Sequence, residues 1–363
     1  MARLGDVLRI LSARSVPATS KNWLLNLEMV QQQTGKVIDY QYVSPAELEG
    51  SIVSFDTSIV LYSKLRPNLN KVVVPEQNGY CTSEMLPLQP DAFRLTREYL
   101  AWYLRSDSFV TWAVSKTFGA KMPRLGTKEL LSHNIPLPDL PIQRRIAATL
   151  DKVSEGIDLC RKMLGDLDAL VKSQFVEMVE GCGGIPTRMG DIASYINGAA
   201  FKPKDWSKNG KPIIRIQNLN DPSAEYNCFS GQIDEKYLVK PGEVLISWAT
   251  HLEAYIWNGE EAWLNQHIFR VVFDKMDVDK TFFIYAANVA LKEAFKLAHG
   301  FKPTMEHIKR GDFEDSKVYL PPKDTQVRFA VFAEQTDKSK SAIQQQLSAL
   351  ETLKKSLMQK YFA

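Results

Sequence analysis

The sequence contains few cysteines and no long apolar run. Its four cysteines, Cys81, Cys160, Cys182 and Cys228, are scattered and form no Cys-x-x-Cys pair, which argues against a zinc ribbon and against a disulfide scaffold. No run approaches the roughly 18 apolar residues of a membrane span, and the N-terminus lacks the apolar core of a signal peptide. We therefore expect a protein of the reducing cytoplasm without a membrane partner.

The motifs of common enzymes are missing as well. The only Asp-Pro pair, Asp221-Pro222, lacks the second proline and the aromatic residue of an amino-methyltransferase loop. There is no Gly-x-x-x-x-Gly-Lys-Ser/Thr phosphate loop and no Gly-x-Gly-x-x-Gly turn. The five histidines include no His-x-x-x-His pair and therefore no visible set of metal ligands. We expect neither catalysis nor a metal site in this chain.

The composition is that of a globular protein with room for two or more domains. Of 363 residues, 45% are hydrophobic and 24% are charged. The net charge of +3 and the pI of about 8.5 are compatible with nucleic-acid binding but do not require it. A weakly basic total can still hide a strongly basic face.

The most informative feature is an internal repeat. Residues 3–7 (RLGDV) return 185 positions later as 188–192 (RMGDI), and residues 60–63 (VLYS) return 184 positions later as 244–247 (VLIS). Further matches with nearly the same offset are residues 118–123 with 299–304, 137–138 with 320–321, Gln143 with Gln326, and 170–173 with 353–356. Each match alone is weak, but their common order and offset indicate a duplicated domain.

Each half repeats one order of elements. Short β-rich runs, such as residues 58–62, 71–74, 243–248 and 267–273, alternate with Pro, Gly and Asn clusters, which is typical of strands joined by turns. An amphipathic helix follows at about residues 96–116 and 279–298. A basic loop, a short strand bounded by proline and one long helix complete each half.

The two long helices carry a heptad pattern. In residues 141–180 the apolar positions alternate in steps of four and three, and residues 323–363 repeat this pattern with Thr336 and Lys340 weakening its middle. The predicted seam comprises Ile146, Leu150, Val153, Ile157, Cys160, Leu164, Leu167, Val171, Gln174 and Met178 in the first helix, and Phe329, Phe332, Ile343, Leu347, Leu350, Leu357 and Tyr361 in the second. We expect the two helices to pair antiparallel as a coiled coil, with the globular halves at opposite ends.

The sequence thus predicts an α+β fold with a pseudo-two-fold internal repeat. The expected domains are a first globular domain at 1–138, a central coiled-coil helix at 139–182, a second globular domain at 183–321 and a C-terminal coiled-coil helix at 322–363.

Two globular halves, each followed by a matching helix, resemble the specificity subunit of type I restriction–modification systems. The resemblance rests on residues 136–147 (PLPDLPIQRRIA) and 320–330 (LPPKDTQVRFA), the Gly5-Asp6 and Gly190-Asp191 openings, and residues 60–71 (VLYSKLRPNLNK). It covers essentially the whole chain, although the individual motifs are loose.

The resemblance implies a DNA-recognition protein without catalysis of its own. Each globular half would be a target recognition domain that reads one half of a bipartite, gapped site in double-stranded DNA. The paired helices would set the gap and dock two methyltransferase (modification) subunits. S-adenosylmethionine, ATP and Mg would belong to partners, namely the modification subunits and the restriction subunits that translocate DNA.

DNA contact requires cations for phosphates and short polar or amide groups for base edges. The candidates of the first half are Lys64, Arg66, Asn68, Asn70, Lys71, Lys121, Arg124 and Lys128; those of the second half are Lys202, Lys204, Trp248, Thr250, His251, Lys302 and Thr304. Any single one of these residues can equally belong to a solvated turn, although the loops as groups favour DNA contact. Trp248, which follows a strand, can instead pack. A second hypothesis for the chain is a coiled-coil adaptor whose halves bind protein and lack DNA specificity.

Overall fold

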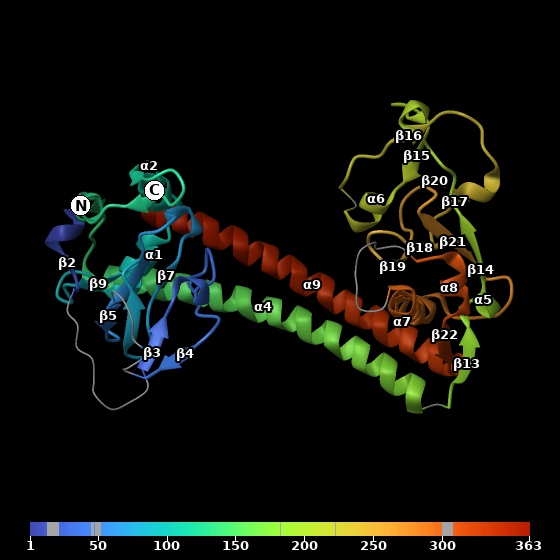
Figure 1. Cartoon of the computed structure of the whole chain (residues 1–363), viewed down its shortest axis with the longest axis horizontal. Helices are drawn as coiled ribbons and strands as arrows, with labels where there is room; N and C mark the ends of the chain where they lie inside the picture. The colour runs from blue at the N-terminus through green and yellow to red at the C-terminus, as the bar shows by residue number, and fades with distance from the viewer. Residues whose placement is uncertain (13–21, 45–46, 48–51, 182, 222, 300–307) are drawn as a thin grey trace. The chain divides into compact units, whose positions relative to one another are not determined.

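The computed structural model describes residues 1–12, 22–44, 47, 52–181, 183–221, 223–299 and 308–363 (Figure 1). The chain forms two compact units. One consists of Met1–Lys162 with Gln344–Ala363, and the other of Met163–Ile343. Each long helix therefore contributes one segment to each unit.

The described part of the first unit contains two sheets of four strands. One has the order β2-β9-β6-β7 and the other β4-β3-β8-β5, in which β3 and β8 run parallel and the remaining neighbours antiparallel. The elements are β1 Ala2–Arg3, β2 Leu8–Ile10, β3 Asn22–Leu25, β4 Gln41–Val43, β5 Ile52–Phe55, β6 Val60–Ser63, β7 Val72–Val73, β8 Gly79–Thr82, β9 Met85–Pro90, α1 Arg97–Leu104, α2 Asp107–Ser115, β10 Thr117–Phe118, β11 Arg124–Leu125, α3 Thr127–Ser132, β12 Asn134–Ile135 and the first part of α4 Leu140–Gly181.

The second unit repeats this arrangement strand by strand. Its two described four-stranded sheets have the orders β14-β21-β18-β19 and β16-β15-β20-β17, again with one parallel pair, β15 and β20. The elements are β13 Ile185–Arg188, α5 Met189–Ile192, β14 Ser194–Asn197, β15 Lys211–Ile214, α6 Ile216–Asn220, β16 Cys228–Phe229, β17 Leu238–Val239, β18 Val244–Ser247, β19 Glu253–Ile256, β20 Ala262–Leu264, β21 Ile268–Val272, α7 Lys280–His299, α8 Arg310–Asp315, β22 Lys317–Leu320 and the first part of α9 Lys323–Phe362. The shared strand order confirms the predicted duplication and the α+β class.

One predicted helix is broken. The sequence pattern predicts a single helix over residues 96–116, whereas the structure has α1 and α2 with a break between Leu104 and Asp107. The side chain of Ser106 accepts a hydrogen bond from the backbone N–H of Phe109 and so caps α2. A serine before an acidic residue is a helix-start signal, and here it divides an otherwise continuous apolar pattern.

The segments of α4 and α9 pair antiparallel within each unit (Figure 1). In the first unit, Ile146 and Leu150 share a core with Leu357 and Phe362. Farther along the same pair, Arg161 Nη2 donates to Glu351 Oε1 at 2.7 Å. In the second unit Lys340 Nζ lies 2.7 Å from Asp168 Oδ1, and Phe175 packs on Phe329 with ring centroids 5.3 Å apart.

The predicted seam is buried most completely in the first unit. Ile146, Leu150, Val153, Ile157, Cys160 and Leu347 are buried, whereas Leu164, Leu167, Ile343, Leu350 and Leu357 are partly buried. Gly156 allows close packing here, because a Cβ at this position would lie 3.2 Å from Leu350 Cδ1. At the predicted seam position Gln174 the side chain is partly buried, and the neighbouring Phe175 is buried. A straight helix drifts by about 20° per heptad, which brings the next residue toward the core.

A buried glutamine joins each long helix to its globular unit. Gln143 Oε1 accepts from Thr96 N at 2.9 Å, and its Nε2 donates to the carbonyl oxygens of Pro138 at 2.7 Å and Arg94 at 2.8 Å. In the second unit, Gln326 Oε1 accepts from Asp279 N at 3.0 Å and its Nε2 donates to Pro321 O at 2.9 Å. These matched contacts explain why the two glutamines occupy equivalent places in the repeat.

Candidate nucleic-acid interface

The two basic loops predicted in the first half lie side by side. Leu65 and Arg124 form a β-bridge, the N–H of Arg66 donates to Pro123 O at 2.8 Å, and the N–H of Leu125 donates to Lys64 O at 2.9 Å. Residues about 60 positions apart in the sequence therefore form one continuous surface. The sequence predicts each loop separately but not their contact.

The loop after β6 has a defined backbone. Ser63 is 3% exposed, and its hydroxyl donates to Leu65 O at 2.9 Å. Arg66 then adopts the left-handed conformation with φ 48°, which a residue with a Cβ rarely takes. The turn directs the chain into the short 3-10 segment Pro67–Leu69.

Several predicted contact residues remain available on this surface. Arg66, Asn68, Lys121 and Lys128 are exposed and Lys64 is partly exposed. Among the described residues, none of these four cations has an acidic partner within ion-pair distance. Arg66 Nη2 makes only a long contact, 3.4 Å, with Lys121 O. Unpaired cations of this kind are suited to phosphate groups.

Three other candidates hold the loops in place. Arg124 Nη2 lies 3.1 Å from Glu84 Oε1 and Arg124 Nε 3.1 Å from Glu84 Oε2, and this hydrogen bonding raises the pKa of Arg124. Lys71 Nζ donates to Leu27 O, and burial lowers the pKa of this lysine. Asn70 is buried, has φ 50° and donates through Nδ2 to Arg105 O at 3.0 Å.

The second unit contains the same turn with different side chains. Ser247 is fully buried, its hydroxyl donates to Ala249 O at 3.2 Å, and Thr250 has φ 63°. Thr250 and His251 are exposed, and His251 Nε2 lies 2.8 Å from Glu253 Oε2. Where the first turn presents cations, the second therefore presents small polar groups.

Trp248 behaves as a packing residue. It is partly buried and stacks on Phe269 with ring centroids 5.8 Å apart and planes 23° apart. Its backbone oxygen accepts from Ile308 N at 3.0 Å. The geometry therefore supports the packing alternative for Trp248 rather than a base contact.

A second basic segment of the second unit lies around the 3-10 turn Pro203–Asp205. Lys202 and Lys204 are exposed there. The guanidinium of Arg215 lies 5.1 Å from the ring centre of Trp206. Arg215 could not be predicted from the sequence as part of this segment, because it lies apart from the basic run at residues 202–204. The candidates Lys302 and Thr304 lie outside the described residues.

Among the described residues, no cluster of three or more His, Cys, Asp or Glu side chains has the arrangement of a metal site. Of the helices in the described ranges, none has the length and apolarity needed to cross a membrane.

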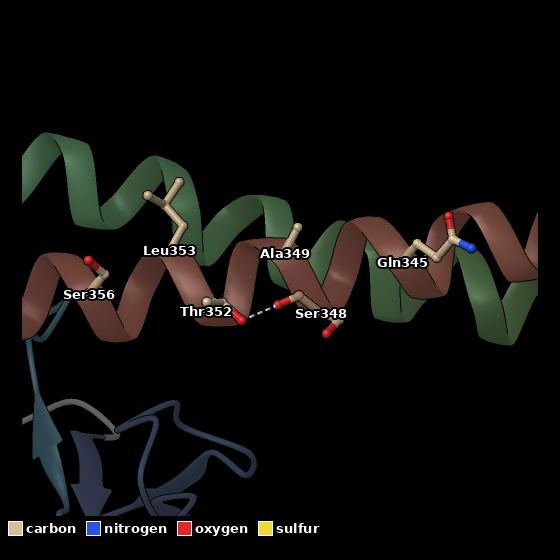
Figure 2. Close-up of a pocket in the computed structure, with 6 residues that line it drawn as sticks. All are labelled: Gln345, Ser348, Ala349, Thr352, Leu353 and Ser356. Carbon is tan, nitrogen blue, oxygen red and sulfur yellow. Dashed lines mark hydrogen bonds between the residues drawn. The ribbon is translucent and has the colours of Figure 1, made fainter.

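The long helices also carry apolar side chains on their outer surface. In the first unit Leu159 is 58% exposed and Leu353 46% exposed. Figure 2 shows Leu353 in a shallow hollow on α9 beside small side chains, where Thr352 Oγ1 donates to Ser348 O at 2.9 Å. The residues lining this hollow are Gln345, Ser348, Ala349, Thr352, Leu353 and Ser356.

Comparison with known proteins gives consistent matches. The family model of the type I restriction modification DNA specificity domain matches the chain twice, over residues 3–167 and 186–352. The chain is 25% identical over 144 residues to the type I restriction enzyme EcoDI specificity subunit of Escherichia coli, covering 40% of this chain and 32% of that protein. It is 30% identical over 164 residues to the EcoBI specificity subunit of Escherichia coli, covering 43% and 34%. A third match, 24% identical over 177 residues, is the MjaVIII specificity subunit of Methanocaldococcus jannaschii, covering 48% and 41%. The matched regions thus span about a third to two fifths of these relatives.

Two solved structures share the fold. One is a chain from a study of complex assembly and conformational transition of the type I restriction–modification system, with a TM-score of 0.61, 18% identity and coverage of 99% of this chain and 96% of that chain. The other is the type I restriction–modification S subunit from M. genitalium, with a TM-score of 0.61, 14% identity and coverage of 100% and 95%. At these identities the likeness concerns the fold.

Proposed function

Because the chain belongs to the type I restriction modification DNA specificity domain family, we propose that it is the DNA-recognition subunit of such a system. Each globular unit binds one half of a bipartite, gapped site in double-stranded DNA, and the chain itself catalyses no reaction. The observation that carries the proposal is the duplicated turn at Ser63 and Ser247, which has one backbone geometry but different outward side chains. Two related readers with different targets require this combination.

The charges of the first unit suggest a division of labour at its DNA surface. Lys64, Arg66 and Lys121 bind phosphates, and the exposed Asn68 contacts base edges, since an amide can pair with adenine. In the second unit Lys202 and Lys204 bind phosphates, while Thr250 and His251 face bases. Arg124, Lys71 and Asn70 act by holding their loops.

The long helices have a separate role in the proposed complex. They set the gap between the half-sites and dock two methyltransferase subunits, for which the exposed Leu159 and Leu353 provide apolar contacts. S-adenosylmethionine binds to these partners, and ATP with Mg belongs to the restriction subunits. The chain itself needs no cofactor.

A comparison of DNA methylation in cells with and without this gene tests the proposal directly. Loss of methylation at one bipartite sequence is expected. Unchanged methylation, together with no sequence-specific protection of DNA by the purified complex, would instead favour the adaptor hypothesis.

The salt dependence of binding tests the phosphate contacts. Substitution of Lys64, Arg66 or Lys121 by Ala should each reduce the slope of log affinity against log salt by about 1, because one fewer phosphate is neutralised. Lys338→Ala, which removes an exposed cation from α9, is the control and should leave the slope unchanged. Equal slopes for all four variants would contradict the assigned surface.

The docking role is tested by Leu353→Glu. A charge at this exposed apolar position should weaken association with the methyltransferase subunit in a pull-down while circular dichroism stays unchanged. Phe93→Glu, at a position 91% exposed on the globular part, is the matched control. Equal association of both variants would remove Leu353 from the docking surface.

A further inference from the structure

Two apolar side chains stand at the tip of the basic surface in the first unit. Phe118 is 62% exposed and Met122 is 46% exposed. Phe118 ends β10 and Met122 lies in the loop of the β10–β11 hairpin, in which Thr117 pairs with Leu125 and Phe118 with Arg124. We call Phe118 and Met122 the apolar tip.

The hairpin that carries the apolar tip is fixed from several sides. Gly119 has φ 92°, and a Cβ there would lie 3.2 Å from Met122 O, so the tight turn depends on glycine. Arg124 is held by Glu84, and Pro123 O accepts from Arg66 N at 2.8 Å. These contacts hold the backbone of the hairpin that carries the apolar tip, which lowers the entropy cost of binding.

The charges around the apolar tip indicate what kind of ligand it binds. Lys121 lies in the hairpin loop, Lys116 directly precedes the hairpin at the end of α2, and Lys64 and Arg66 lie on the loop bound to it. None of these cations has an acidic partner among the described residues. A ligand of this surface must combine dense negative charge with an apolar interior that Phe and Met can enter. Double-stranded DNA has both properties, since charged phosphates flank stacked bases.

We propose that Phe118 and Met122 form a wedge that enters a base step of the DNA bound to the first unit. Phenylalanine and methionine are typical wedge residues, and their insertion partly unstacks one step and kinks the duplex. The surrounding cations hold the phosphates on either side of the opened step. The inference rests on the proposed DNA-recognition function and adds selection for a step that unstacks easily, such as TA or CA.

Fluorescence of 2-aminopurine tests the wedge, because this base emits more strongly when unstacked. The experiment uses the complex with its methyltransferase subunits, without S-adenosylmethionine, and a duplex carrying the site identified by the methylation comparison. The label replaces in turn each adenine of either strand of the first half-site, because 2-aminopurine pairs with thymine. Any base that the complex methylates is left out, since a methyltransferase itself removes it from the stack. Emission should rise at one step with the wild-type chain.

Variants of the chain then test whether Phe118 and Met122 cause this rise in fluorescence. Phe118→Ala with Met122→Ala should abolish the rise and weaken binding by about tenfold or more, because an aromatic–base contact contributes about one to two powers of ten in affinity. Phe118→Leu, a smaller wedge, should retain part of the rise. Phe93→Ala, which removes another exposed phenylalanine of the same unit, should change neither quantity.

The outcomes separate the wedge from the function on which it rests. Specific binding without a rise at any labelled position overturns the wedge and leaves the proposed function intact. A rise that persists in the double variant also overturns it. If the double variant instead loses association with the methyltransferase subunits at unchanged emission, the tip is a protein contact and the wedge is refuted. No specific binding by the wild-type complex refutes both proposals.

Discussion

Replacement of Gln143 by Met tests how each long helix is fixed to its globular unit. The side chain is fully buried and makes three hydrogen bonds, to Thr96 N, Arg94 O and Pro138 O. Methionine has a similar length but leaves all three backbone groups unpaired. At about 1 kcal/mol net for each bond, the loss is about 3 kcal/mol. The matched Gln326→Met removes two bonds, to Asp279 N and Pro321 O, and should cost about 2 kcal/mol.

Hydrogen exchange followed by mass spectrometry measures the two effects separately in the whole chain, because it reports local opening. Gln143→Met should increase exchange in α1 about a hundredfold and affect α7 less, whereas Gln326→Met should increase exchange in α7 about thirtyfold. Gln346→Met, at an exposed position of α9, is the control and should change neither peptide. A change below tenfold in α1 for Gln143→Met would refute the hydrogen-bond argument.

Two further predictions concern the cores. Phe329→Ala should lower the free energy of unfolding by about 3–5 kcal/mol, measured by urea denaturation, because its fully buried ring packs on Phe175 and Tyr285; a loss below 1 kcal/mol would contradict this packing. Burial raises the pKa of Cys81 to about 12 from the 9.0 of a free thiol, so the folded state opposes ionisation and its stability, complete below pH 9, should fall as the pH rises toward 12. Cys81→Ala should reduce this alkaline loss in denaturation curves recorded across the range, and an identical loss in both chains would exclude the thiol as a cause.

The parts of the fold that could be predicted from sequence are those encoded by local periodicity. The apolar steps of four and three predict α4 and α9 within a few residues, and the repeat predicts two units of one topology. The constant heptad of the pattern does not predict that Phe175, beside the partly buried Gln174, packs on Phe282. The break between α1 and α2 at Ser106 has a helix-cap signal in the sequence, but the apolar pattern continues across it and predicts one helix.

The candidate site was predictable as two loops and not as one surface. The bridge between Leu65 and Arg124 depends on the packing of segments that are distant in sequence. The same holds for the ion pair between Glu84 and Arg124, which lie 40 positions apart in the sequence. Charge alone therefore identifies candidate residues. Only the tertiary contacts show that Lys64 and Lys121 are free to bind a ligand, whereas Lys71 donates a hydrogen bond within its own unit.

The turn shared by Ser63 and Ser247 has a consequence for how such proteins change over time. Its backbone path depends on an inward hydroxyl and one left-handed residue, Arg66 in the first unit and Thr250 in the second. The residue at 64 can therefore be exchanged for others while the strand beneath keeps its register, whereas the left-handed position restricts residues with a Cβ. If the turn reads DNA as proposed, a few outward substitutions would alter the target without rebuilding the long helices.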